Sequence, residues 1–186
     1  MPRITAERRA ARRQQILEAA WECFTRHGFQ ATTMDQVAAA AGVSAGTTYT
    51  YFATKDELVI ATAEVAIGQF AQAFEQLADR ADPASPTEIL AAIADQLRRR
   101  GGHPRHDMTK IALQAWAESI RSPAVHHTIR EGHDRLGVIL RTLVQRWAAT
   151  TARPVDSERT SELLQTLVPG LMLATVLTGH PPTITV

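Results

Sequence analysis

The chain has 186 residues, of which 45% are hydrophobic, and a formal net charge of +1, so it is long enough to bury one large core or two small ones. Neither an apolar run approaching the roughly 20 residues of a membrane span nor the apolar core of a secretory signal stands out. We therefore exclude a membrane-spanning or disordered chain and expect a cytoplasmic protein, in which the single Cys23 is a core residue rather than a catalytic thiol.

The positive charge is concentrated near the amino terminus. Residues 1–55 carry seven basic and four acidic side chains, whereas residues 56–186 carry 13 and 15. Five of the arginines lie within residues 1–13. A basic segment beside a compact module favours a polyanionic partner, and a merely solvated chain end fits the same pattern.

Helical signals run through the whole chain. Apolar residues recur at spacings of three and four, and aromatic residues make up only 5%, which is typical of an all-α protein. Start signals include the capping spacings Thr33–Gln36 and Thr54–Glu57, and stop signals include Gly28, the turn Gly42-Val43 and the proline-rich break at 82–87. The predicted helices are 6–27, 33–41, 45–52, 54–81, 86–100, 107–121, 123–150 and 156–178.

Residues 33–52 have the pattern of a helix-turn-helix, in which two short helices are separated by a glycine turn. In that motif the second helix enters the DNA major groove. Gly46, Thr47 and Thr50 are small enough to let the backbone approach DNA, and threonine hydroxyls can bond phosphate oxygens. The sequence therefore predicts a DNA-binding module in the first third of the chain.

The two tyrosines of the chain, Tyr49 and Tyr51, both lie in the second of these helices. Two positions on a helix are about 200° apart, so the two rings cannot share a face. We expect one of them, preferably Tyr49, to reach the DNA backbone while the other anchors the helix, and Phe52 to lie in the core. Lys55 begins the next helix and adds a cation and amide donors for phosphate.

The run TTMDQVAAAAGVSAGTTYTYFATKDEL, Thr32 to Leu58, resembles the DNA-binding signature of TetR-family transcriptional regulators. The preceding run QQILEAAWECFTRHGFQATT, Gln14 to Thr33, resembles their first helix and its exit. The resemblance implies a helix-turn-helix domain over residues 1–53, with a basic amino-terminal arm, and a helical regulatory domain over residues 54–186. The DNA-contacting residues that it implies are Thr33, Ser44, Ala45, Gly46, Thr47, Thr48, Tyr49, Thr50, Tyr51, Lys55, Arg3, Arg8 and Arg12.

Two positions depart from the family pattern. Ala45 stands where members often carry lysine, which removes one DNA-proximal cation. Thr48 stands where a large apolar residue is usual, so we expect either weaker packing there or a hydroxyl that bonds a backbone carbonyl. The amino-terminal arginines are expected to compensate by following phosphate or entering a minor groove, as basic arms do.

By the same resemblance, the regulatory domain binds a small apolar or aromatic effector. The middle helices supply enough apolar and aromatic side chains to line a pocket, although ordinary core packing is the better explanation for any single one of them. The candidate pocket residues are Phe70, Phe74, Ile93, Leu97, Met108, Ile111, Trp116, Ile120, His127 and Met172.

The last two predicted helices carry more apolar surface than one protomer readily buries, which favours a homodimer joined through a four-helix interface. A purely internal bundle is the alternative. The candidate interface residues are Leu136, Leu140, Leu143, Trp147, Leu164, Leu167, Leu171 and Ala174.

Catalysis and metal binding are the remaining alternatives. His103-x-x-His106 has possible ligand spacing, but it lies in a Gly-Pro loop without a cysteine partner, so solvated histidines are preferred and we expect neither metal nor cofactor. No phosphate loop, nucleophile elbow or carboxylate pair stands out. The sequence therefore favours a dimeric regulator that binds double-stranded operator DNA, most simply a repressor, over a helical enzyme or small-molecule-binding protein with an accessory helix-turn-helix.

Overall fold

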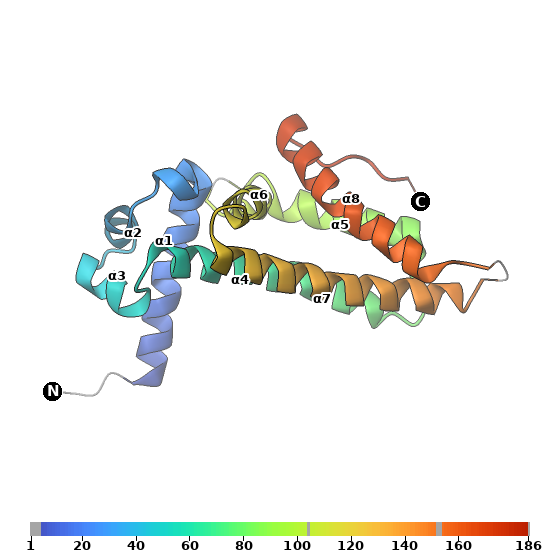
Figure 1. The fold of residues 1–186 in the computed structure, drawn as a ribbon, viewed down its shortest axis with the longest axis horizontal. Coiled ribbons are helices and arrows are strands. Elements are labelled where there is room, and N and C mark those ends of the chain that lie inside the picture. The colour runs from blue at the N-terminus through green and yellow to red at the C-terminus, as the bar shows by residue number, and fades with distance from the viewer. Residues whose placement is uncertain (1–4, 104, 152–153, 186) are drawn as a thin grey trace.

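A computed structural model describes residues 5–103, 105–151 and 154–185, and within them it confirms the all-α prediction with eight helices and no strand (Figure 1). The bounds follow the predicted ones within a few residues because the caps operate as expected. The helices are α1 (Ala6–Ala31), α2 (Met34–Ala40), α3 (Ala45–Tyr51), α4 (Lys55–Ala78), α5 (Pro86–Arg100), α6 (Met108–Ser119), α7 (Pro123–Ala148) and α8 (Ser157–Thr178).

The caps show why the short helices stop where they do. Thr33 accepts a hydrogen bond from the Gln36 backbone N–H, and the Gln36 side chain accepts from the Thr33 N–H, so the predicted capping box is present. Thr54 likewise caps α4, but the Glu57 carboxylate accepts from the N–H of Ala53 instead of Thr54. At Gly28 the backbone leaves the helical conformation, with φ 82° and ψ 165°, so the regular helix is interrupted there as predicted and resumes only as far as Ala31.

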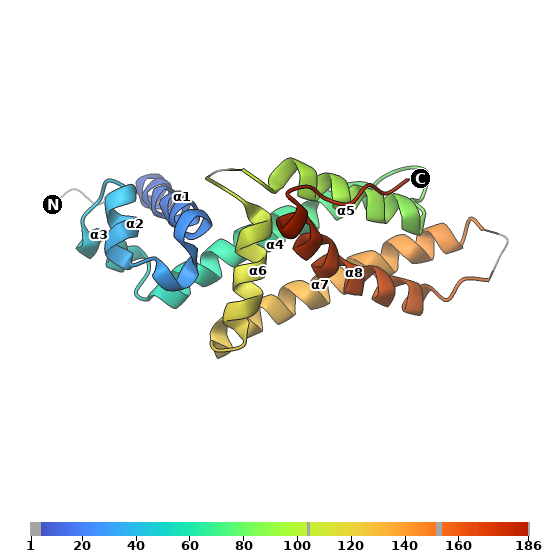
Figure 2. The ribbon, with the colours of Figure 1, turned by 90° about the horizontal axis from the view of Figure 1, so that it is seen from above.

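The helices form two parts that α4 connects (Figures 1 and 2). Helices α1, α2 and α3 lie at one end of the molecule, and α5 to α8 lie along and beyond α4, which packs most extensively against α7. One continuous set of buried apolar side chains runs through both parts and includes Phe24, Phe52, Leu58 and Phe74. A displacement of α4 would therefore change the packing of both parts.

Hydrogen bonds tie the two parts together at α6. The Gln114 side chain donates to the Phe24 carbonyl at 3.2 Å and accepts from the Phe29 N–H at 2.7 Å, so it holds α1 on both sides of the Gly28 kink. The Ser122 hydroxyl, at the start of α7, donates to Asp56 on α4 at 2.9 Å. The helix-turn-helix part is therefore held by specific polar contacts as well as by the core.

Helix α8 qualifies one sequence expectation. Within the described residues it is the one helix long and apolar enough to cross a membrane by length and composition, and 28% of an 18-residue stretch of it is buried. A core helix of a soluble protein meets the same criteria, so this is weak evidence for a span. It does show that the last helix carries more apolar surface than its own protomer covers.

Candidate functional site

The turn between α2 and α3 is built by glycine and fixed by α1. Gly42 has φ 63°, a left-handed conformation that side-chain-bearing residues rarely adopt. The Gln15 side chain of α1 donates to the Ala41 carbonyl at 2.6 Å, just before the turn. After it, the Ser44 hydroxyl accepts from the Thr47 N–H and caps α3. These contacts fix the angle at which α3 leaves the body of the molecule.

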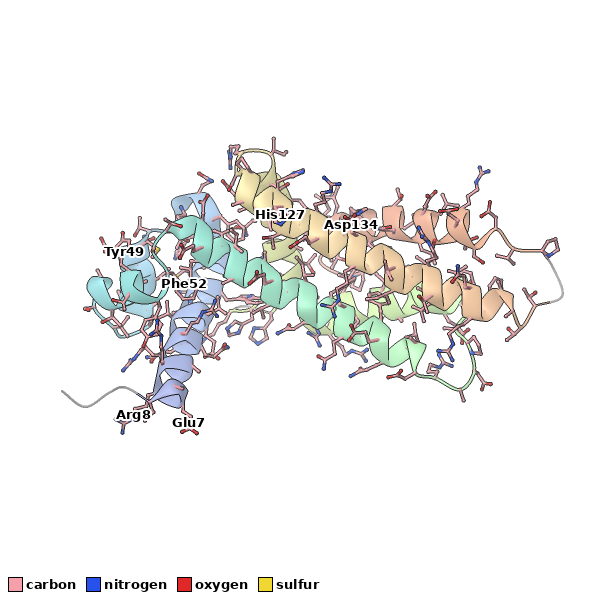
Figure 3. The ribbon with its side chains drawn as sticks, turned by 60° about the horizontal axis from the view of Figure 1, so that its bottom comes forward. Glu7, Arg8, Tyr49, Phe52, His127 and Asp134 are labelled. Atoms are coloured by element: carbon pink, nitrogen blue, oxygen red, sulfur yellow. The ribbon has the colours of Figure 1, made fainter. Side chains whose placement is uncertain are left out.

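Helix α3 presents a mixed surface to solvent. Tyr49 is 49% exposed, and Gly46 and Thr50 are also exposed; Figure 3 places Tyr49 on α3 at the end of the molecule distant from α8. The hydroxyls of Ser44 and Thr47 lie 2.8 Å apart, and that of Thr50 donates to the Gly46 carbonyl. Ala45 and Thr47 are half-buried. Contact of these residues with DNA stays a prediction.

Thr48 does not belong to this surface. Its side chain is 0% exposed, so the prediction that it contacts DNA is wrong. The expectation that its hydroxyl bonds a backbone carbonyl is also wrong, since the buried Oγ1 has no hydrogen-bond partner. Thr48 occupies the apolar position of α3 that packs onto the rest of the small domain, and its hydroxyl is desolvated without compensation.

The other aromatic residues of α3 and its cap face inward. Phe52 is buried, and Tyr51 is half-buried against the core. Two arginines of α1 cover these rings: the Arg9 guanidinium lies 6.0 Å from the centre of the Tyr51 ring, and that of Arg13 lies 4.8 Å from the centre of the Phe52 ring. Sequence reasoning missed both arginine contacts, although their spacing of four on one helix is the signal of a shared face.

The remaining predicted DNA contacts are less uniform. Arg8 and Arg12 are exposed and lie within α1, as the predicted helix 6–27 implies, and Figure 3 shows Arg8 at the amino-terminal end of that helix. Their contact with DNA stays a prediction. Arg3 lies outside the described residues. The Lys55 ammonium donates to the Gln30 carbonyl at 3.0 Å, and Thr33 is exposed as the cap of α2.

An apolar cavity of about 100 Å³ lies among α4, α6, α7 and α8. Four predicted pocket residues line it: Phe70, Met108, Trp116 and Met172. Its polar lining is His133 and Gln165, and no carboxylate belongs to the lining. The other residues that sequence reasoning missed are Ala63, Ala66, Ile67, Ala71, Ala112, Ala115, Ile129, Gly132, Leu136, Val168 and Pro169.

The other six predicted pocket residues do not line this cavity. Ile120 is 86% exposed, and His127 is exposed on the outside of α7 beside Glu131, 3.2 Å away (Figure 3). Four are buried in the core: Phe74, Ile93, Leu97 and Ile111. Helical spacing identified buried faces correctly but does not distinguish a packed core position from one that borders a cavity.

Some of the candidate dimer residues are buried within the chain, and others are exposed. Leu140, Leu143 and Leu164 are buried within the protomer, so their placement at an interface is wrong. Leu136 lines the cavity, and Trp147, Leu171 and Ala174 are half-buried. Leu167 is 47% exposed, and the exposed leucines that helical geometry places within about 120° of one another on α8 are called the α8 face: Leu163, Leu167, Leu173 and Leu177.

The described residues give little support to other chemistry. They hold no group of three or more His, Cys, Asp and Glu side chains placed to bind a metal ion. Cys23 is buried, and its burial raises the pKa of the thiol, which favours the unreactive protonated form.

Comparison with known proteins gives a consistent result. The model of bacterial regulatory proteins of the tetR family matches residues 16–62, and that of the C-terminal domain of BetI-type transcriptional repressors matches residues 86–185. The HTH-type transcriptional regulator BetI of Escherichia coli is 27% identical over 185 residues, which cover 97% of this chain and 89% of BetI.

Shorter and structural matches agree with this result. An uncharacterized HTH-type transcriptional regulator of Bacillus subtilis, YhgD, is 55% identical over 47 residues, so the match spans only 25% of that relative's length. The crystal structure of the multidrug binding protein EbrR complexed with malachite green is 27% identical, with a TM-score of 0.67 over 91% of this chain and 90% of that one.

Proposed function

Because the chain belongs to the TetR family of bacterial regulatory proteins, we propose that it is a homodimeric transcriptional repressor that leaves its operator when a small apolar or aromatic effector binds. It acts in the cytoplasm as a DNA-binding protein and not as an enzyme. Its partners are double-stranded operator DNA, a second copy of the chain and the effector, and the proposal includes no cofactor.

The exposure of one side of α3, with its other side packed against the small domain, is the observation that carries this proposal. Thr48 and Phe52 are buried and hold the helix against the rest of the molecule. Tyr49, Gly46 and Thr50 are exposed to solvent. A short helix that is rigidly supported and carries small and hydroxyl-bearing side chains is suited to lie in a major groove. The Tyr49 hydroxyl would donate to a phosphate oxygen.

The α8 face supports the dimer. Its leucines are left uncovered within one protomer, and Val138 of the neighbouring helix α7 is also exposed. Pairing this face with its copy would bury them and form a four-helix interface. A two-fold dimer would then place its two α3 helices roughly 34–36 Å apart, as successive major-groove faces require.

The cavity supports an apolar effector. Phe70, Trp116 and two methionines give it an apolar wall without a carboxylate to balance a cation. A volume of about 100 Å³ is below the roughly 300–1,000 Å³ of most ligand pockets. A ligand of several rings must therefore separate the surrounding helices. That movement transmits the effect of binding to the rest of the molecule.

Helix α6 provides the path from the cavity to DNA. Ala112, Ala115 and Trp116 border the cavity, while Gln114 on the same helix bonds the backbone of α1 on both sides of its kink. An effector that moves α6 therefore also moves α1. The Gln15 side chain of α1 bonds the Ala41 carbonyl just before the turn that orients α3. This is a coupling between two sites through one rigid element.

Selection of the purified protein against a randomised duplex-DNA library at low salt tests the proposal. We expect a palindromic consensus, bound with an affinity that falls steeply with salt. Tyr49→Phe should weaken binding to that consensus, whereas Tyr51→Phe, which removes the matched hydroxyl from the inward-facing ring, should not. Absence of any enriched sequence at low salt would contradict the proposal.

A further inference from the structure

A second cavity lies at the junction of the two parts of the molecule. This junction cleft has a volume of about 410 Å³, larger than the apolar cavity and within the usual range of ligand pockets. Figure 2 shows the chain between α5 and α6 passing close to α1 at this junction. Its lining comes from α1, α4, α5, the segment before α6, and Met108: Gln14, Leu17, Glu18, Trp21, Val65, Gln69, Arg99, Arg100, His103, His106 and Met108.

The cleft is lined by two arginines and one glutamate. Arg100 donates to the neutral Gln69 side chain at 2.8 Å and has no carboxylate partner among the described residues. Arg99 pairs with Asp95, outside the cleft lining. The one acidic lining residue is Glu18, which accepts a hydrogen bond from Gln14 at 3.0 Å. Arg100 therefore offers a guanidinium that forms no ion pair among the described residues, although Glu18 lines the same cleft.

Trp21 adds an unused donor to the same wall. Its side chain is 6% exposed, and its indole Nε1 is buried without a hydrogen-bond partner. A buried N–H without an acceptor is costly, and because this one is closed to solvent, a ligand oxygen would remove that cost once the Trp21 ring turns its N–H toward the cleft. The His106 ring lies edge-on to Trp21, with the ring centres 6.2 Å apart, and the His103 ring follows at 5.6 Å from His106.

We propose that the junction cleft is a second binding site, for a small organic anion in which a carboxylate or phosphate group is attached to an apolar body. The anionic group bonds Arg100 and the Trp21 indole N–H, with the two histidines beside it. The apolar body packs on Leu17, Val65 and Met108. The site is separate from the apolar cavity and goes beyond the proposed function, because it requires no ligand in that cavity.

Occupation of the cleft would act on the helix-turn-helix part directly. Its walls come from α1 on one side and from α4 and α5 on the other, so a ligand that bonds both sides fixes the angle between the two parts. Met108 lines both cavities, and its flexible side chain separates one ligand from the other. Binding in the cleft is therefore expected to change the affinity of the apolar cavity as well.

Calorimetric titration of the full chain with benzoate and with phenyl phosphate, both at up to millimolar concentration, tests the site. Benzamide is the neutral match to benzoate. We expect one anion to bind per protomer, and Arg100→Gln to weaken binding about tenfold or more, since it removes a charged hydrogen bond. Arg98→Gln is the control, because Arg98 is two residues away on α5, pairs with Asp95 and does not line the cleft.

Two further variants separate the cleft from the apolar cavity. Trp21→Phe keeps a six-membered aromatic ring and removes the five-membered ring with its N–H, so it should weaken anion binding. Trp116→Leu alters the apolar cavity and should leave anion binding unchanged. The proposal is overturned if neither anion binds, if benzamide binds as well as benzoate, or if Arg98→Gln and Arg100→Gln have equal effects. Loss of binding in Trp116→Leu with retention in Arg100→Gln would place the anion in the apolar cavity and also overturn it.

Discussion

Some residues of α3 pack against the rest of the molecule, and others are exposed to solvent. The 200° separation of Tyr49 and Tyr51 along a helix was sufficient to predict that they face different ways, and one is exposed while the other packs inward. The arginines that cover Tyr51 and Phe52 could not be predicted in the same way. Their contacts depend on how α1 crosses α3, which local spacing does not specify.

Thr48 gives the clearest prediction for a single residue. Its buried hydroxyl has no partner, so Thr48→Val, which keeps the shape and removes the hydroxyl, should stabilise the protein by about 1 kcal/mol. Chemical denaturation measures the change. Thr50→Val is the matched control, because Thr50 is exposed and its substitution should alter the free energy of unfolding little. A less stable Thr48→Val protein would mean that the hydroxyl has a partner after all.

Whole helices were the level at which the sequence was most informative. Caps at Thr33, Ser44 and Ser85 and glycines at kinks and turns act locally, so the helix bounds could be predicted closely. The cavity could not be predicted to the same degree. Phe70 lines it and Phe74, one turn later, is core, because the helices around α4 leave an unfilled space beside Phe70 and fill the space beside Phe74.

Two glycines of α7 test how tightly the helices around the cavity pack. A Cβ at Gly132 would lie 2.8–3.2 Å from three side-chain atoms of Ile67, a branched residue of α4, whereas a Cβ at Gly137 would meet the flexible end of Gln165. Helix propensity favours alanine over glycine by about 1 kcal/mol, and overpacking costs about 1–3 kcal/mol. Gly137→Ala should therefore stabilise the protein and Gly132→Ala should not. Equal stabilisation in thermal melts would show that α4 and α7 separate easily.

At the scale of the whole molecule, the α8 face predicts the oligomeric state. Leu167→Glu places a charge on this face and should convert a dimer into a monomer in analytical ultracentrifugation, because burial of an unpaired carboxylate is costly. The control is Ile120→Glu, since Ile120 is an exposed apolar residue at the C-cap of α6, outside the α8 face. Dimers that persist in Leu167→Glu would point to an interface elsewhere.

The connection between cavity and DNA rests on Gln114, the α6 residue that bonds α1 at Phe24 and Phe29. Gln114→Leu removes both bonds and leaves the cavity lining intact, so the variant should still bind the selected operator and the effector found by screening against it. What it should lose is coupling: the ratio of operator dissociation constants with and without saturating effector should fall toward one. Gln165→Leu is the contrasting variant, because Gln165 lines the cavity. This substitution should change the affinity for the effector, but saturating effector should still release the protein fully from the operator. If Gln114→Leu is still fully released, the signal does not pass through α6, and the contact of α4 with α7 becomes the path to test.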